Sequence, residues 1–523
     1  MSEPRAPFIR LTQDGPSVRV EGVAEWASVA QPEGPEIGLM RGAWTWDGTR
    51  LRAEVDRYGF YNLFVYAKDG VVAVSPSLLE LVAQGCDATP DARALAVFHR
   101  LGIFINDDTP LRHVRTLPPA GRLEWHDGKF GITGHTEIPR AQKITRDQAV
   151  EGMRAHFSEA MARIMTHVDG RVILPLSGGR DSRHILLEML AQGHRPQACV
   201  TFHHNGAQMN REAQAARAVC ARVGVRHDVL GHARPRLADM LRVLALTGLC
   251  ADEHAQMMPL HDYFAHRDAI GFDGIAGDIL TNPDDWADDF FRMAGRGDYR
   301  GIALGMMEGH GGVISQASWA RGAGPIHSPG WDGEVLDYVG RAVASYADAP
   351  DPYQLFWMYH RTRREINFVP QAILSPAKIV FTPYLDPAFA DFCMSLPYSV
   401  TVDQQLHNDV LRIAYPQVAD LPFQEGFAEP PRRRGSPGHK LRSLADAWAI
   451  AGVLAPDARL DAVRRWVRPR ARLKRQPGDV YDLHGLCLDG LDADRARAIL
   501  ALAARLEARA PTDLLTDRLE ARA

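Results

Sequence analysis

The fold of this chain is decided by the stretch Val172-Ile173-Leu174-Pro175-Leu176-Ser177-Gly178-Gly179-Arg180-Asp181-Ser182-Arg183-His184-Ile185-Leu186. Its first residues are apolar and mostly branched, which is typical of a buried parallel strand. The run breaks at the serine and two glycines, and apolar residues with helical spacing follow from Ser182. A strand, a glycine turn and a helix N-terminus in this order predict an anion site, because main-chain N–H groups can approach an oxyanion closely there.

The sequence of this loop differs from that of the common phosphate loop, because an aspartate and not a lysine follows the glycines. An acid beside phosphates needs a divalent cation between them. A glycine-rich turn with a helix-capping serine is the simpler alternative. The motif Ser-Gly-Gly-x-Asp-Ser resembles the pyrophosphate loop of the asparagine synthetase family. That resemblance implies ATP and Mg²⁺ as cofactors, bound at Leu176, Ser177, Gly178, Gly179, Asp181 and Ser182.

The length and composition of the chain limit the classes of protein to which it can belong. The chain has 523 residues, 46% hydrophobic and 24% charged, with a net charge of −4, so two or three ordinary domains are expected. The balanced charge argues against nucleic acid and membrane surfaces as partners. The six cysteines lack paired spacing, and neither a signal segment nor a membrane-spanning run is evident. These features predict a cytoplasmic protein with reduced thiols.

Residues 1–138 read as a β-rich domain that resembles the glutaminase domain of the same family. Asp56-Arg57-Tyr58-Gly59 and Leu117-Pro118-Pro119-Ala120-Gly121 fit two of the family's motifs, although ordinary β-turns would look similar. A working glutaminase of this family uses an N-terminal cysteine as nucleophile. The chain begins Met1-Ser2, and its first cysteine is Cys86. We therefore expect a domain that no longer hydrolyses glutamine.

A strand–helix–strand pattern follows the glycine loop, over about 197–229, and predicts a doubly wound α/β unit. Residues 146–523 are thus expected to form a doubly wound parallel-sheet synthetase domain of the adenine-nucleotide-hydrolase type, with helical additions. By resemblance, Val200 and Phe202 border the adenine. His203 and His204 are expected to lie at a solvated strand end rather than to bind a metal, because no further ligands are near.

A second acidic loop, Asp273-Gly274-Ile275-Ala276-Gly277-Asp278, again follows a strand-like run. The resemblance implies that Gly274 lies at the nucleotide and that Asp181 and Asp278 together hold Mg²⁺ on the pyrophosphate. An aspartate that only caps the next helix is the alternative.

Thr382-Pro383-Tyr384-Leu385-Asp386 resembles a segment at the floor of the family's synthetase site. Family members place an acidic residue at about the distance of Glu365 before that segment, and in the β-lactam-forming branch this acid serves the attacking amine. The resemblance therefore makes Glu365 the candidate general base, or the acid that orients the base. An ion pair with neighbouring arginines is nearly as good an explanation of Glu365.

Two residues depart from the family. Ile275 stands where the β-lactam-forming branch has tyrosine and asparagine synthetases have glutamate, and Gln424 stands where the family has a lysine that stabilises acylation. We expect Lys440, or one of the arginines at 432, 433 and 434, to supply that positive charge.

The sequence therefore predicts an ATP-dependent carboxylate–amine ligase that forms an amide through an acyl-adenylate and releases AMP and pyrophosphate. An intramolecular lactam, as in β-lactam synthetases or lasso-peptide cyclases, is one form of this reaction. A small-molecule or peptide carboxylate is the expected substrate, and a precursor peptide or other biosynthetic proteins are the expected partners. The alternatives are an amidating enzyme that uses free ammonia or another amine on a small molecule or sugar acid, and a non-catalytic nucleotide-binding scaffold.

Overall fold

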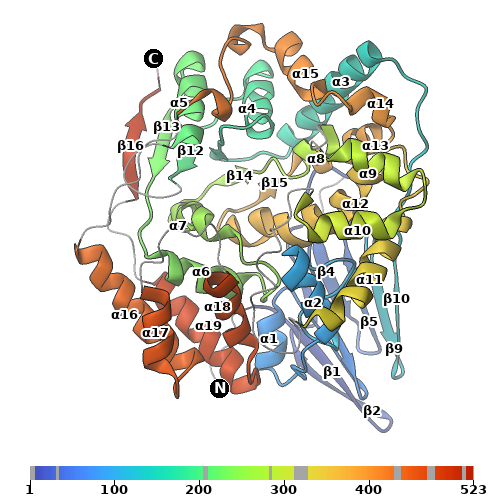
Figure 1. Cartoon of the computed structure of the whole chain (residues 1–523), viewed down its shortest axis with the longest axis vertical. Helices are drawn as coiled ribbons and strands as arrows, with labels where there is room; N and C mark the ends of the chain where they lie inside the picture. The colour runs from blue at the N-terminus through green and yellow to red at the C-terminus, as the bar shows by residue number, and fades with distance from the viewer. Residues whose placement is uncertain are drawn as a thin grey trace.

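The fold was analysed in a computed structural model of the chain (Figure 1). The structure describes residues 6–30, 34–203, 210–281, 286–310, 328–428, 437–467, 477–508 and 514–521. The chain is of the mixed α/β class, as predicted, with one mainly parallel sheet and two antiparallel sheets.

The mainly parallel sheet has six strands. Its first strand along the chain is β11 (Val172–Pro175), the strand singled out in the sequence, and it lies in the interior of the sheet. In spatial order the strands are β15 (Val380–Phe381), β14 (Ile270–Phe272), β11, β12 (Ala198–Phe202), β13 (His227–Leu230) and β16 (Leu515–Leu519). All neighbours are parallel except β16, which pairs antiparallel with β13. The register sets Leu174 of β11 opposite Cys199 of β12.

Helices cover both faces of this sheet, which explains why β11 is apolar without alternation. Val172 and Leu174 pack in one hydrophobic core and Ile173 packs in another. The first core includes α3 (Arg146–Met165), α4 (Asp181–Ala191) and α5 (Arg211–Val223), and the second includes α6 (Arg236–Leu246) and α7 (Met258–Phe264).

The order of the strands creates a switch point at β11. From β11 the chain adds β12 and β13 on one side, and then returns to add β14 and β15 on the other. Ligands of open α/β sheets bind outside the carboxyl ends of the strands at such a point. The two acidic loops follow β11 and β14, so they flank it.

The N-terminal part is a sandwich of two antiparallel sheets that enclose a core of their own. One sheet is ordered β2 (Ser17–Gly22), β1 (Ile9–Asp14), β7 (Val71–Ser75), β6 (Phe64–Lys68) and β8 (Val114–Thr116). The other is ordered β10 (Lys129–Thr133), β9 (Arg122–His126), β5 (Arg50–Val55), β4 (Gly42–Trp46) and β3 (Glu25–Ala27). The helices α1 (Leu78–Ala83) and α2 (Ala92–Leu101) begin at the caps Ser77 and Asp91.

The two motifs of the N-terminal part meet in space. The Asp56 carboxylate accepts hydrogen bonds from the main-chain N–H groups of Phe60, Tyr61 and Arg41. Gly59 has a φ of +66°, and a Cβ there would lie 2.9 Å from Pro119. Only glycine fits this close approach, so the spacing of both motifs has a structural cause.

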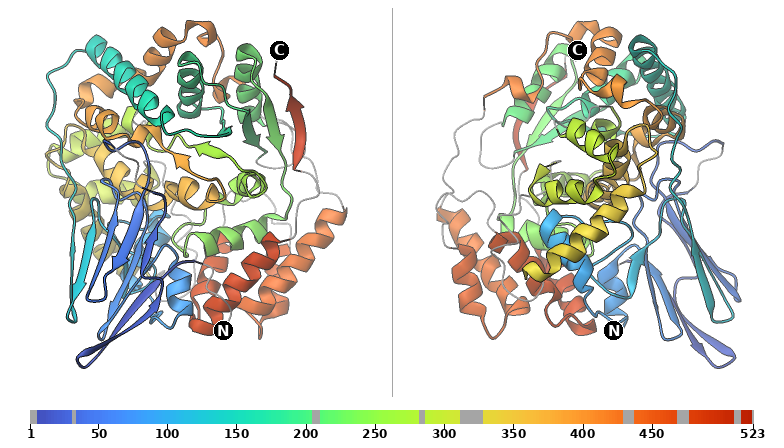
Figure 2. Two further views of the ribbon diagram at one scale, coloured as in Figure 1. Left: turned by 180° about the vertical axis from the view of Figure 1, so that it is seen from behind. Right: turned by 45° about the vertical axis from the view of Figure 1, so that its right-hand side comes forward.

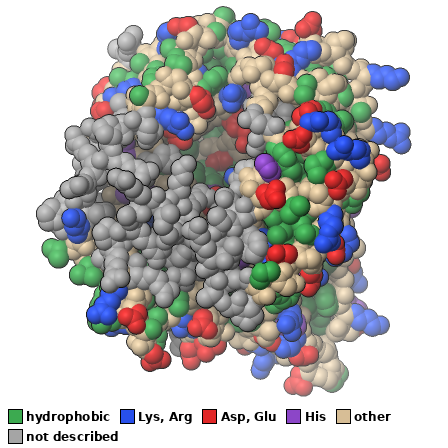
Figure 3. Space-filling model, in the orientation of Figure 1, with side chains coloured by type: hydrophobic (Ala, Val, Ile, Leu, Met, Phe, Trp, Pro, Cys, Tyr) green, Lys and Arg blue, Asp and Glu red, His purple; other side chains and the backbone are tan. Residues whose placement is uncertain are grey.

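The remaining helices lie around the parallel sheet and on one side of the N-terminal sandwich, whose other side carries no helix of the described residues (Figure 2). They are α8 (Gly277–Thr281), α9 (Ala287–Ala294), α10 (Tyr299–Met307), α11 (Asp332–Ala344), α12 (Pro352–Trp357), α13 (Pro387–Met394), α14 (Tyr398–Thr401), α15 (Leu406–Ala414), α16 (Pro437–Leu454), α17 (Arg459–Val467), α18 (Pro477–Leu488) and α19 (Ala493–Glu507). The helix α19 packs against α1 and α6, and so joins the N-terminal part to the parallel-sheet part. Acidic and basic side chains are interspersed over the coloured part of the face shown in Figure 3. Among the described residues no helix is both long and apolar enough to cross a membrane.

A π-helical segment fastens the two parts together. It comprises η6 (Met358–Ile366) and η7 (Val369–Ile373). Arg363 donates to the carbonyl oxygens of Gly59 and Leu117, and the fully buried Arg364 donates to Asn62 and to the carbonyl oxygen of Asp108. Both arginines thus find their acceptors in the N-terminal part.

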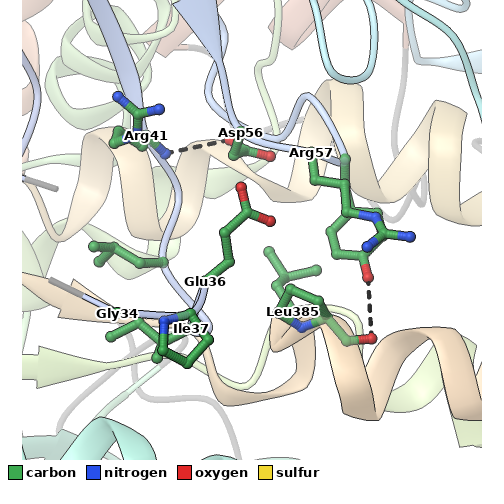
Figure 4. A pocket seen from close by; sticks show the side chains of 11 residues that line it. Gly34, Glu36, Ile37, Arg41, Asp56, Arg57 and Leu385 are labelled. Carbon is green, nitrogen blue, oxygen red and sulfur yellow. Dashed lines mark hydrogen bonds between the residues drawn. The ribbon is translucent and has the colours of Figure 1, made fainter. Parts of the chain in front are cut away.

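A small hollow lies at the same junction (Figure 4). It has a volume of about 50 Å³ and is lined by the loop around Glu36, by Asp56 and Arg57, and by Leu385 and Pro387. This volume suits a few water molecules rather than a substrate.

Two local expectations need correction. The helix after the glycine loop begins at Asp181, one residue before the predicted start at Ser182. His203 is not at a solvated strand end, since it is buried and its Nε2 lies 2.8 Å from Thr516 Oγ1. His204 lies outside the described residues.

The buried arginine gives a test of this junction. We expect Arg364→Met to lower the free energy of unfolding by about 2–4 kcal/mol, because it leaves buried acceptors without a donor. Arg52→Met is the matched control, with an expected change below about 1 kcal/mol, since that arginine is half exposed and pairs with Glu124 at 3.5 Å. Urea unfolding measures both, and equal losses would contradict the docking role of Arg364.

Candidate functional site

A pocket of about 730 Å³ opens at the carboxyl ends of β11, β12 and β14. Ligand pockets of proteins typically measure about 300–1,000 Å³. The structure brings most of the predicted nucleotide residues to its wall. They are Leu176, Ser177, Asp181, Ser182, Val200, Phe202, Gly274 and Asp278.

Hydrogen bonds within the glycine loop fix its shape. Ser177 N–H donates to Ser182 Oγ at 3.0 Å, and Gly179 N–H donates to Ser177 Oγ at 3.2 Å. Ser182 therefore holds the loop and does not cap the helix. The cap position of α4 is Arg180, whose side chain makes no capping hydrogen bond. The first N–H groups of α4 have no acceptor within the helix and are suited to bind an anion.

The two glycines of the loop were also predicted to bind the nucleotide, but they do not lie on the pocket wall. Gly178 and Gly179 are not among the described residues that line the pocket. The Gly178 carbonyl oxygen accepts from Gln424 N–H at 3.0 Å, and a Cβ on Gly178 would lie 2.5 Å from the Cβ of Gln424. Gln424 thus packs directly on the glycine loop, and this contact requires glycine at position 178.

Asp181 interlocks the two acidic loops. A Cβ on Gly274 would lie 2.8 Å from Asp181 Cβ, and a Cβ on Gly277 would lie 2.7 Å from Asp181 Oδ1. The main-chain N–H of Asp278 donates a hydrogen bond to the Asp181 carboxylate. The glycines of the second loop are therefore needed to admit this side chain.

The charge of Asp181 is disfavoured in the pocket. Burial, and then the charges of Asp278 and Asp273, hold the pKa of Asp181 well above its usual value, although Arg180 opposes this. Burial also raises the pKa of Asp273 to about 6. A carboxylate whose charge is disfavoured by burial and by neighbouring carboxylates is a favourable place for a cation.

Buried side chains on the side away from the pocket hold Asp181 in position. His407 Nδ1 lies 3.4 Å from Asp181 Oδ1 and 3.1 Å from Thr281 Oγ1, and His407 Nε2 lies 3.0 Å from His184 Nδ1. Tyr384 Oη donates to the main-chain oxygen of Asp181 at 3.1 Å. Burial, followed by the charge of Arg180, lowers the pKa of His407 to about 3, so this ring is neutral.

The two aspartates fit the predicted magnesium role. Both line the same pocket, and Asp278 also accepts from the N–H of the next residue, Ile279, at 2.7 Å. Asp278 lies inside α8, so it is not the residue that caps this helix. Among the described residues, no group of three or more histidines, cysteines, aspartates and glutamates could hold a metal. A Mg²⁺ held by Asp181 and Asp278 would therefore take its other oxygen ligands from phosphate and water.

Glu365 lies behind the pocket wall rather than on it. It is 1% exposed, and its carboxylate oxygens lie 3.1 Å from His254 Nε2 and 3.7 Å from Arg361 Nε. His254 and Arg361 both line the pocket. Glu365 thus orients two pocket residues, and the expected ion pair with a neighbouring arginine is present as well.

The predicted source of positive charge is not at the pocket. Lys440 is exposed on α16, which packs against α6, α17 and α19, and it is not among the described lining residues. The arginines at 432, 433 and 434 lie outside the described residues. Within the described lining, Arg361 is the one guanidinium, whereas the carboxylates are Asp181, Glu212, Glu253, Asp273 and Asp278.

His254 and Arg361 were not predicted from the sequence. Arg361 precedes Glu365 by four residues in one helical segment, and this spacing was a usable signal. His254 is separated from Glu365 by 111 positions, so no local pattern could connect them.

Comparisons with known proteins do not assign the chain to a family. The sequence matches no model of a known protein family, and no curated protein matches it.

The interlocked glycines lead to a test. We expect Gly277→Ala to weaken the binding of magnesium α,β-methylene-ATP at least about tenfold, because the new methyl group displaces the Asp181 carboxylate. Gly485→Ala in α18 is the control, since a Cβ there meets nothing within 4 Å and alanine favours a helix. Calorimetric titration measures both, and unchanged binding in Gly277→Ala would refute the interlock.

Proposed function

We propose that this protein is an ATP-dependent carboxylate–amine ligase that forms an amide through an acyl-adenylate and releases AMP and pyrophosphate. One observation carries the proposal: Asp181 and Asp278, which follow neighbouring parallel strands, share a single pocket with the glycine loop. This arrangement suits the polyphosphate of ATP and the cation that accompanies it.

The residues divide the chemistry as follows. A carboxylate oxygen of the substrate attacks the α-phosphorus of ATP, and the bond to pyrophosphate breaks. Ser177 and the first N–H groups of α4 bind the departing phosphates. Asp181 and Asp278 would hold Mg²⁺, which neutralises charge on the leaving group. An amine then attacks the acyl carbon, and AMP leaves.

Arg361 is the best-placed cation for the adenylation step. The carboxylates of Glu365, Glu253 and Asp278 raise its pKa, although burial opposes them, so it stays charged. Its guanidinium can approach a negatively charged carboxylate or α-phosphate. Arg361 thus takes the role that Lys440 was expected to have.

Apolar side chains separate the reaction from water. Tyr353, Trp357, Ile366 and Val369 form one wall of the pocket, and the first two are almost fully buried. An acyl-adenylate is hydrolysed by stray water, so a dry wall favours capture by an amine.

The N-terminal part, residues 1–138, is proposed to be a glutaminase-like domain without activity, and residues 146–523 a synthetase domain like that of the asparagine synthetase family. Burial raises the pKa of Cys86 to about 12, so this thiol stays protonated. The amine is therefore proposed to come from the substrate or from solution. All six cysteines are buried and free, which supports the proposal of a cytoplasmic location.

Pyrophosphate exchange tests the proposed reaction. With ATP, Mg²⁺ and a panel of amino acids, dicarboxylic acids, uronic acids and short peptides, labelled pyrophosphate should enter ATP only with an accepted carboxylate. The nucleotide product should be AMP. Formation of ADP, or binding of ATP without exchange for any acid of the panel, would overturn the proposal.

Asp181→Asn separates stability from function. We expect this variant to lose the effect of Mg²⁺ on the binding of α,β-methylene-ATP, because one of the two carboxylates is gone. The ligand-free protein should gain about 0.5–2 kcal/mol in stability, since burying neighbouring acids is unfavourable. Calorimetric titration and urea unfolding measure the two effects. The exposed Asp268→Asn should change neither.

Exchange rates can distinguish the two candidate cations. We expect Arg361→Met to lower pyrophosphate exchange about 10²–10³-fold, as removal of a group that stabilises transition-state charge does. Lys440→Met should leave exchange within about threefold of the wild type, because it lies away from the pocket. The reverse result would restore Lys440 to the role predicted from the sequence.

A further inference from the structure

One histidine of the pocket lining has no assigned part in the adenylation step, and it is paired with Glu365 behind the wall. His254 is 4% exposed and lines the pocket, and its Nε2 lies 3.1 Å from the carboxylate and 3.0 Å from the main-chain oxygen of Glu365. The pair comes from segments far apart in the chain, η1 (His254–Met257) and η6.

The partners of His254 determine its tautomer. Both oxygens of Glu365 that face Nε2 are acceptors, so Nε2 carries the proton. In the neutral ring the lone pair is then on Nδ1. Within the described part of the chain, no hydrogen bond to Nδ1 is present. When the ring is neutral, Nδ1 is therefore the nitrogen that can accept a proton.

The charges around the ring make His254 a stronger base. Burial by itself lowers the pKa of His254, but the Glu365 carboxylate outweighs it and raises the pKa above its ordinary value. Glu253 and Asp273 also face the ring. On the helices α6 and α7 that pack against η1, Arg242 pairs with both Asp239 and Asp262, and His261 pairs with Glu507.

We propose that His254, oriented by Glu365, is the base that accepts the proton of the attacking amine. This inference rests on the proposed ligase function and deepens it. The amine lone pair forms the N–C bond to the acyl carbon, the bond from that carbon to the phosphate oxygen breaks, and AMP leaves with the electron pair. The proton moves from nitrogen to Nδ1 of His254, and the Glu365 carboxylate stabilises the imidazolium.

Two reactions distinguish this role from the adenylation step. Pyrophosphate exchange reports adenylation, and the trapping of the acyl group by hydroxylamine as a hydroxamate reports amine attack. With a carboxylate that supports exchange, His254→Asn should lower the ratio of hydroxamate formation to exchange about 10²–10⁴-fold. His261→Asn is a close control, because that buried histidine lies 3.1 Å from Glu507 but does not line the pocket. It should leave the ratio unchanged.

The pH profile supplies a second readout. A base acts when it is deprotonated, so hydroxamate formation should rise with pH through the pKa of His254. Loss of the carboxylate in Glu365→Gln lowers that pKa, and the rising limb should therefore move to lower pH. Glu365→Asp should move the limb part of the way back. A limb that stays in place in Glu365→Gln would overturn the role of the pair.

Nitrogen NMR of histidine-labelled protein tests the pair without any substrate. The neutral His254 ring should show a proton on Nε2. Its signals are assigned because they disappear from the spectrum of His254→Asn. A proton on Nδ1 of the neutral ring would overturn the proposal. An unchanged ratio in His254→Asn, with exchange intact, would place the base elsewhere and leave the ligase function standing. No exchange by the wild type would remove the ligase function and this inference together.

Discussion

The carboxyl group of Asp181 occupies the space that Gly274 and Gly277 leave open, and the rest of the site depends on this contact. It holds the loop after β11 against the loop after β14, which are neighbours only because the strands are parallel and adjacent. The electrostatic cost is a partly buried acid close to the carboxylates of Asp278 and Asp273. Such strain is typical of functional sites, where binding a ligand relieves it.

The pocket combines two kinds of chemical group. Near the glycine loop, main-chain N–H groups and two aspartates are suited to phosphate with a cation. His254 and Arg361 line the same pocket and share one buried partner, Glu365. This combination agrees with the two successive reactions that we propose at one carboxyl carbon.

Local signals made part of this arrangement predictable. The strand, the glycine turn and the helix around Ser177 are formed by consecutive residues, so a local sequence pattern predicts them. The acidic loop that ends at Asp278 has the same pattern of a strand followed by glycines and an aspartate. Properties that depend on distant packing were missed. His203 is buried because a strand more than 300 residues away supplies Thr516, and Lys440 is remote because α16 packs beside α19. Sequence spacing does not encode either contact, just as it does not encode the pair of His254 and Glu365.

The segment η6 faces the pocket with Arg361 and the N-terminal sandwich with Arg363 and Arg364. One wall of the site is thus held in place by contacts with the N-terminal sandwich. Removing that sandwich would leave two buried guanidinium groups without their acceptors and loosen the helix that carries Glu365. The N-terminal part is therefore a mechanical support of the pocket, and the two parts of the chain depend on each other for their shape.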